Sequence, residues 1–249
     1  MTRCEILGIP VVAARRDEAV KEIERVAERS TPALIAYANA HTLNLASRDP
    51  VYKRVLLDAA LVLNDGAGIA IAARIQGRRF PENLNGSDFN PLIVEMAARR
   101  GWPVYFLGAR KGVAERAATI LAGRFPELQV AGTHHGFFDD EATLVATIRA
   151  SGAGVLMVAM GNPFQEMFLD RNLAASGAWL GVGVGAFFDF TTGTVQRAPA
   201  WMNKLGIEWI FRLFQEPGRM WRRYVLGNPE FLWRVLRARF GGRGQRRTG

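Results

Sequence analysis

The chain has a single cysteine, Cys4, and no long apolar run. One cysteine cannot form an intrachain disulfide, which is compatible with a reducing compartment. No stretch of about 18 uninterrupted apolar residues occurs, so the sequence predicts no transmembrane helix. The first residues also lack the apolar run of a signal peptide. Any contact with a membrane is therefore expected to be peripheral.

Three common ligand-binding motifs are missing as well. The sequence has no D-x-D carboxylate pair, no Walker loop and no G-x-G-x-x-G dinucleotide fingerprint. The missing fingerprint disfavours a nicotinamide-dependent oxidoreductase. Without paired carboxylates to hold Mg²⁺, a nucleoside diphosphate would be bound by arginines or helix N-termini. The sequence therefore predicts no metal ion and no other cofactor.

Acidic residues are scarce only near the C-terminus. Residues 195–249 carry 12 Lys and Arg against 3 Asp and Glu, whereas residues 1–194 carry 20 of each kind. The same 55 residues contain four of the six tryptophans. A neutral body with a basic, aromatic tail indicates a binding or catalytic domain that is delivered to an anionic surface.

Short apolar runs alternate with helical stretches along the body. The predicted strands cover residues 33–38, 61–63, 104–107, 129–132, 155–160 and 179–184. The predicted helices cover residues 42–60, 67–76, 87–99, 112–124, 141–150 and 164–175. Unbroken apolar strands separated by helices indicate an α/β fold with a parallel sheet covered on both faces. A change of composition near Thr194–Pro199 predicts a boundary between a body, residues 1–195, and an appendage, residues 196–249.

Asp65 is the most interesting acidic residue. It follows a predicted buried strand and precedes Gly66, and ligands of open α/β sheets bind beyond the carboxyl ends of the strands. A carboxylate in such a crevice could serve as a general base with a raised pKa. On local sequence alone, a turn or helix-cap role is favoured, because such positions select aspartate for structural reasons.

Two glycine-rich segments and a histidine pair have weaker signals. Gly108–Gly112 offers backbone N–H groups, Arg110 and Lys111 at a predicted helix N-terminus, which suits a diphosphate. For the glycines of 181–185, close packing is the favoured interpretation. His134 and His135 are adjacent on a predicted strand and are expected to point in different directions, which argues against a shared metal ion.

The tail is predicted to form helices over residues 201–214 and 230–240. The second helix has an apolar side beside three arginines, which is an interfacial pattern; that side consists of Phe231, Leu232, Val235, Leu236 and Phe240. We favour an anionic membrane as the partner. Packing of the helix on its own domain and a nucleic-acid-binding arm are the alternatives. Aromatic residues at helical spacing argue against nucleic acid.

An ordered series of short motifs resembles a known family. The series is Asn39-Ala40, Asn64-Asp65-Gly66, Glu82-x-x-x-Gly86-x-Asp88, Gly161-x-Pro163-x-Gln165-Glu166, Gly181-x-Gly183, Asp189-Phe190-x-x-Gly193, Arg197-Ala198-Pro199, Glu208-Trp209-x-x-Arg212-Leu213, Glu216-Pro217-x-Arg219 and Arg222-Arg223-Tyr224. Together they resemble the WecG/TagA/CpsF glycosyltransferases, glycosyltransferase family 26. The match runs from about Ala36 to Tyr224, and the ordered set is specific although each piece is weak.

The resemblance implies a Rossmann-like catalytic domain with a helical C-terminal appendage. It implies an inverting enzyme that moves a sugar from a UDP-sugar to a polyprenyl-diphosphate-linked saccharide at the cytoplasmic face of the membrane. In the family, the residue matching Asp65 is the proposed base, Gln165 matches a pocket residue, and Arg212, Arg219 and Arg222 match arginines that contact the diphosphate. The chain is compatible with a homo-oligomer as well as a monomer.

Two positions depart from the teichoic-acid and common-antigen enzymes of the family. Asn83 stands where an arginine is usual, and Tyr37 stands where a threonine is common. Losing an arginine removes a charge and a bidentate donor. We therefore expect an exopolysaccharide-type enzyme that uses a UDP-hexose, with an N-acetylmannosaminyltransferase as the alternative. The predicted site consists of Asp65 as the catalytic residue and of Tyr37, Asn39, Asn83, Gly108, Arg110, Gln165, Arg212, Arg219 and Arg222 as substrate-binding residues.

Overall fold

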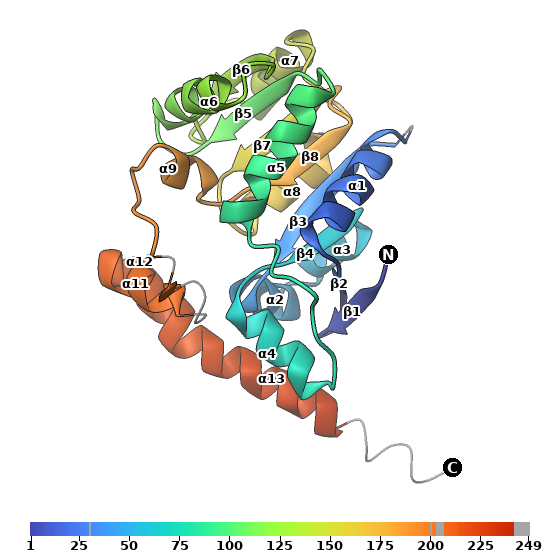
Figure 1. Ribbon diagram of the computed structural model, residues 1–249, viewed down its shortest axis with the longest axis vertical. Helices are drawn as coiled ribbons and strands as arrows, with labels where there is room; N and C mark the ends of the chain where they lie inside the picture. Colours follow the sequence, from blue (N-terminus) through green and yellow to red (C-terminus); the bar gives the residue numbers. More distant parts are fainter. Residues whose placement is uncertain (30, 200, 203–206, 242–249) are drawn as a thin grey trace.

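The computed structural model describes residues 1–29, 31–199, 201–202 and 207–241, without the side chains of positions 219 and 241. Within these residues eight strands form one sheet in the order β1-β2-β4-β3-β8-β7-β5-β6 (Figure 1). The strands are β1 Arg3–Ile6, β2 Ile9–Val12, β3 Ala33–Ala38, β4 Leu61–Asn64, β5 Val104–Gly108, β6 Val130–His134, β7 Val155–Ala159 and β8 Leu180–Gly183. All pairs are parallel except β1 with β2, which are antiparallel. The predicted α/β fold with a largely parallel sheet is confirmed.

Helices cover both faces of the sheet, and a hydrophobic cluster lies under each layer. The first cluster joins the sheet to α1 Arg16–Ala27, α5 Gly86–Arg99, α6 Val113–Arg124 and α9 Phe187–Thr191. The second joins it to α2 Ala40–Arg48, α3 Pro50–Asp58, α4 Ala67–Ile75, α7 Glu141–Ala150, α8 Phe164–Asn172 and α13 Gly227–Gly241. Apolar strands buried on both faces require these two layers.

Helix starts follow the expected capping chemistry in part. Asp49 caps α3 by accepting hydrogen bonds from the backbone of Val51 and Tyr52, and Pro50 follows as the first helical residue. The helix predicted over residues 87–99 begins at Gly86, and Asn85 caps it by accepting a hydrogen bond from the backbone of Asp88. The β1–β2 hairpin, α1 and α9 were not predicted from the sequence.

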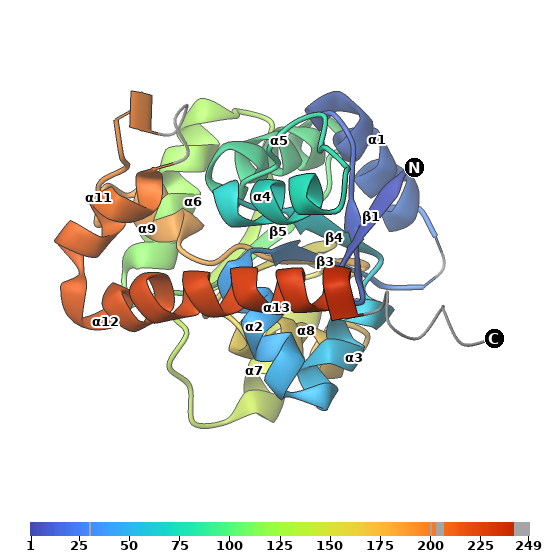
Figure 2. The same cartoon turned by 90° about the horizontal axis from the view of Figure 1, so that it is seen from below.

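The tail continues as α11 Glu208–Gln215, α12 Pro217–Trp221 and a π-helical segment, η1 Arg222–Leu226, before α13. The predicted helix over 201–214 matches α11 in its second half, and residues 203–206 lie outside the described residues. Figure 2 shows α13 lying across the body beside α2 and α4. The domain boundary at residue 195 stays a prediction, although α13 shares a core with the body.

The predicted lipid-facing side of α13 is wrong in its inner half. Phe231 and Val235 are fully buried in the cluster that contains α2 and α4, and Leu232 packs against the same cluster. Leu236 and Phe240 remain exposed. An amphipathic pattern has the same period whether the apolar side meets protein or lipid. No helix in the described ranges is both long and apolar enough to cross a bilayer.

Candidate active site

Asp65 lies at the carboxyl edge of the sheet, directly after β4. The parallel register pairs Ala38 with Asn64, which places the next residues, Asn39 and Asp65, side by side. Asn39 Nδ2 donates a hydrogen bond to Asp65 Oδ2 at 3.2 Å. The N-cap of α4 is Gly66, at φ 85°, and no side chain caps that helix. The cap interpretation of Asp65 is therefore wrong, because its carboxylate is directed to Asn39.

The pKa of the Asp65 carboxyl is raised above its ordinary value. Burial is the largest cause, and the hydrogen bond from Asn39 and the charges of Arg223 and Arg212 act in the opposite direction. Desolvation favours the neutral acid, whereas donors and cations favour the carboxylate. The site therefore combines a more basic carboxylate with two guanidinium groups that keep it available in the charged form.

The segment 82–88 supports the loop that carries Asp65. Asn83 Oδ1 accepts from the Gly66 N–H at 3.2 Å, and Asn64 Nδ2 donates to the Glu82 carbonyl at 2.9 Å. Asp88 forms an ion pair with Arg197. Three of the motifs found in the sequence thus meet here, and Asn83 contacts the backbone beside Asp65.

Tyr37 lies on β3, two residues before Asn39, and is buried, with 5% of its surface exposed. Its hydroxyl donates to Asn90 Oδ1 at 2.6 Å. Burial and the nearby Asp65 charge raise the pKa of this phenol well above its ordinary value, so Tyr37 stays neutral. Asn90, which the sequence analysis did not single out, is fully buried as well.

Gln165 lies in the first turn of α8 Phe164–Asn172, beside the carboxyl ends of β7 and β8. Its Oε1 accepts from the backbone N–H groups of Gly161 and Gly185, at 3.1 and 3.0 Å. Its Nε2 donates to Glu166 Oε1 at 2.7 Å. A Cβ added at Gly183 would lie 2.8 Å from Gln165 Nε2, so the packing role favoured for this glycine is confirmed. Gln165 is 2% exposed and braces two loops of the edge.

Glu166 was not predicted and is the most deeply buried acid of the site. Its carboxylate also accepts from Asn162 Nδ2 at 2.7 Å and from the Tyr52 hydroxyl at 3.1 Å. Burial raises the pKa of Glu166 to about 7, although these donors act to lower it. Glu166 is part of one of the sequence motifs, but its hydrogen bond with Tyr52, 114 residues away, is visible only in the structure.

Gly108 and Arg110 lie further along the same edge, at the end of β5. Strands β3, β8 and β7 separate that end from the end of β4, a distance of roughly 19 Å at one strand spacing per step. A Cβ at Gly108 would lie 2.4 Å from the Ala159 carbonyl oxygen, so this glycine permits close packing. Arg110 is exposed at the rim. The edge therefore brings Asp65, Asn39 and Asn83 together and leaves Arg110 at the far end.

The tail arginines divide into two groups. The Arg212 guanidinium lies over the Phe190 ring at 5.2 Å, and its charge lowers the pKa of Asp65. The Arg222 guanidinium lies over Trp221 at 5.5 Å and is exposed. Arg223 belongs to one of the motifs but was given no role in the predicted site. Its charge lowers the pKa of Asp65. The side chain of Arg219 lies outside the described residues.

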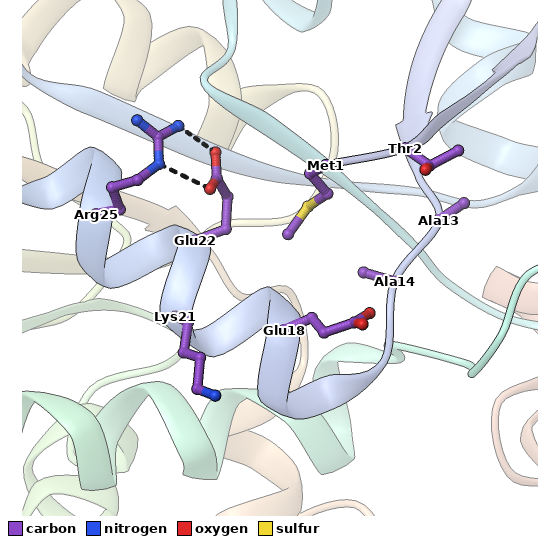
Figure 3. A pocket seen from close by; sticks show the side chains of 8 residues that line it. All are labelled: Met1, Thr2, Ala13, Ala14, Glu18, Lys21, Glu22 and Arg25. Atoms are coloured by element: carbon purple, nitrogen blue, oxygen red, sulfur yellow. Dashed lines mark hydrogen bonds and ion pairs between the residues drawn. The ribbon is translucent and has the colours of Figure 1, made fainter.

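Two other features of the described residues bear on ligand binding. Among them, no group of three or more His, Cys, Asp or Glu residues could hold a metal ion. An open groove of about 460 Å³ runs along α1 (Figure 3), and its lining contains none of the predicted site residues. Glu22 and Arg25 in this groove are already paired with each other.

The arrangement is that of a group-transfer enzyme: a parallel α/β sheet, a basic carboxylate at its carboxyl edge and arginines suited to a phosphorylated ligand. The model of the Glycosyl transferase WecG/TagA/CpsF family matches residues 4–245. The chain therefore belongs to this family and is a glycosyltransferase, which confirms the resemblance and replaces the oxidoreductase alternative.

Two relatives share the same name and function. An N-acetylglucosaminyldiphosphoundecaprenol N-acetyl-beta-D-mannosaminyltransferase from Bacillus subtilis is 27% identical over 233 residues, which cover 93% of this chain and 90% of that protein. A protein of the same name from Bacillus spizizenii is 30% identical over 210 residues, covering 84% of this chain and 81% of the relative. These names favour the N-acetylmannosaminyltransferase alternative over the hexose expectation.

Proposed function

We propose that the protein transfers a sugar, with inversion, from a UDP-sugar to a saccharide linked to a polyprenyl diphosphate. The observation that carries this proposal is the Asp65 carboxylate, which lies at the carboxyl edge with a raised pKa and two arginines acting on it. Inversion needs one base that takes the proton of the acceptor hydroxyl as this hydroxyl attacks the anomeric carbon. Asp65 supplies that base, and Asn39 orients it.

Departure of UDP leaves charge on a diphosphate oxygen. Guanidinium groups bind diphosphates through paired N–H donors and can stabilise this charge as it develops. Arg212 is held for that purpose by α11 and by its contact with Phe190. We propose that the tail arginines supply this stabilisation, in keeping with a sequence that has no D-x-D pair.

We propose N-acetylmannosamine as the transferred sugar and N-acetylglucosaminyl-diphospho-polyprenol as the acceptor. Support comes from both relatives, whose names specify this donor group and this acceptor. A UDP-hexose donor is the second candidate, and Asn83 favours it. The Asn83 amide oxygen accepts from the backbone N–H of Gly66, and an arginine, which has no acceptor, could not make this contact.

The acceptor's diphosphate lies at the headgroup level of a membrane, so the enzyme must work there. We propose a peripheral position at the cytoplasmic face, with the outer side of α13 toward anionic lipid. Trp233, Leu236 and Phe240 are exposed on that side, and the Arg237 guanidinium lies over Trp233 at 5.3 Å. Exposed aromatic residues interleaved with arginines suit such an interface.

A donor panel tests the proposal. Purified protein would receive UDP-N-acetylmannosamine, UDP-N-acetylmannosaminuronate or UDP-glucose with N-acetylglucosaminyl-diphospho-polyprenol in mixed vesicles, and the product would be identified by mass. We expect turnover with UDP-N-acetylmannosamine. Turnover with UDP-glucose alone would establish the second candidate, and the absence of transfer from every donor would refute the proposed function.

A further inference from the structure

We propose that Arg223, and not its neighbour Arg222, is the guanidinium of η1 that binds a substrate diphosphate beside Asp65. The inference rests on the proposed function, since it assigns a substrate contact of that reaction. The resemblance in sequence pointed to Arg222 instead. The two residues carry the same charge and are adjacent, so only the way the chain is folded can distinguish them.

A hydrogen bond fixes η1 against α2. Asn44 Nδ2 of α2 donates to the carbonyl of Gly227, at the end of η1, at 2.7 Å. Arg223 precedes Gly227 by four residues, and His41 precedes Asn44 by three, so each lies about one turn back on the same side of its helix. His41 in turn is two residues from Asn39, which holds Asp65. The contact therefore directs Arg223 toward the start of α2 and the Asp65 crevice.

The electrostatic environment agrees with this placement. His41 has a pKa lowered to about 4, first by burial and then by the charges of Arg223 and Arg48, so its imidazole is neutral near pH 7. The Arg223 charge also lowers the pKa of Asp65. Arg223 of η1 thus lies near both His41 of α2 and Asp65, and Arg212 approaches Asp65 from α11.

Neighbouring residues of a helical segment point in clearly different directions, so Arg222 and Arg223 do not face the same side. The exposed Arg222 stacks on Trp221, which is itself 43% exposed. Arg223 is half-buried and lies over the Tyr224 ring at 5.5 Å, and Tyr224 packs against Trp209 of α11 at 5.9 Å. The π-helical turn is a form that recurs at functional sites. Arg223 is therefore held on the inner side by aromatic contacts.

The ligand of Arg223 is a diphosphate, either that of the UDP-sugar or that of the lipid acceptor. A planar guanidinium binds such groups bidentately. The test compares R223Q with R222Q, two variants that remove the same charge one residue apart. We expect R223Q to lower kcat/KM roughly 10- to 100-fold more than R222Q does. Equal losses, or a larger loss in R222Q, would overturn the assignment.

Separate arms distinguish the two sources of the diphosphate. A rise of KM for the donor and weaker binding of UDP alone would assign Arg223 to the nucleotide. A rise of KM for the acceptor, with UDP binding retained, would assign it to the lipid diphosphate. If wild-type protein transferred no sugar at all, the proposed function would fail by itself. Weaker binding of UDP or of inorganic diphosphate in R223Q than in R222Q would still support Arg223 in that case, and equal binding would overturn it.

A pH profile separates this role from a structural one. The groups that act on Asp65 are the Asn39 amide, neutral Tyr37, Arg212, Arg223 and Glu208. The pKa of Glu208 is raised, first by burial and then by the Asp65 charge. Removing Arg223 removes a charge that favours the carboxylate. The acidic limb of kcat/KM should therefore move to higher pH in R223Q and stay in place in R222Q. An unmoved limb in R223Q would contradict the proposed proximity.

Discussion

Asn39 holds Asp65 with one end of its amide and caps α2 with the other. Its Oδ1 accepts from the backbone N–H of Thr42 at 3.0 Å, which leaves Nδ2 directed at Asp65 Oδ2, 3.2 Å away. The start of a helix thus fixes the orientation of the amide, and the amide fixes the proposed base. The parallel pairing of β3 with β4 makes the contact possible.

The first prediction separates the two functions of Asn39. Serine is as good an N-cap as asparagine, but it has no amide to reach Asp65. The hydrogen bond from Asn39 lowers the pKa of Asp65, so N39S should raise it and move the acidic limb of kcat/KM to higher pH. Thermal stability should stay close to wild type. A limb that does not move would show that Asn39 is only a cap.

The second prediction concerns Asp65 itself. D65N preserves size and hydrogen bonding but cannot take a proton, so turnover should fall on the order of 100- to 10,000-fold. The melting temperature should not fall, because burial disfavours the charged carboxylate in the folded protein. Steady-state kinetics and calorimetry would measure the two effects. A variant near the wild-type rate would remove Asp65 as the base.

The third prediction concerns Glu166. Its pKa is raised from 4.5 to about 7, so the folded protein binds a proton more tightly than the unfolded chain between these values. Stability should therefore fall as pH rises through that window, by roughly 3 kcal/mol at most. E166Q has no charge to bury and should lack this dependence. Urea unfolding between pH 5 and 8 would measure both proteins, and parallel curves would contradict the assignment.

The fold was largely predictable because its signals are local. Buried strands such as Val155–Ala159 are continuous apolar runs, and Asp49-Pro50 has the residues of a helix start. The hairpin of β1 and β2 escaped prediction because the charged residues Arg3 and Glu5 interrupt the apolar residues of β1. The short Ile9–Val12 run contains a proline as well.

Long-range contacts account for what the sequence did not reveal in the site. Asp65 looked like a cap until its partner across the β3–β4 pair was visible. The pocket role of Gln165 stays a prediction, whereas the bonds that its amide accepts from Gly161 and Gly185 could not be predicted from the sequence. Which of two adjacent arginines faces inward depends on how η1 packs against α2, which no local pattern encodes.

The last prediction compares two phenylalanines of α13 that look alike in sequence. Phe231 is fully buried against the body, where a Cβ at Gly68 of α4 would lie 3.9 Å from its ring. Phe240 is 59% exposed, nine positions further along the same helix. F231A should lower the free energy of unfolding by about 3–5 kcal/mol, because it leaves a cavity between α13 and the body.

F240A is the matched control and should change stability by less than about 0.5 kcal/mol. It should instead weaken sedimentation with anionic vesicles, since it removes apolar area from the proposed lipid-facing side. Urea unfolding and a vesicle pelleting assay on both variants would separate the two sides of α13. If F231A were as stable as F240A, α13 would not share a core with the body. If F240A pelleted like wild type, Phe240 would not contribute to membrane contact.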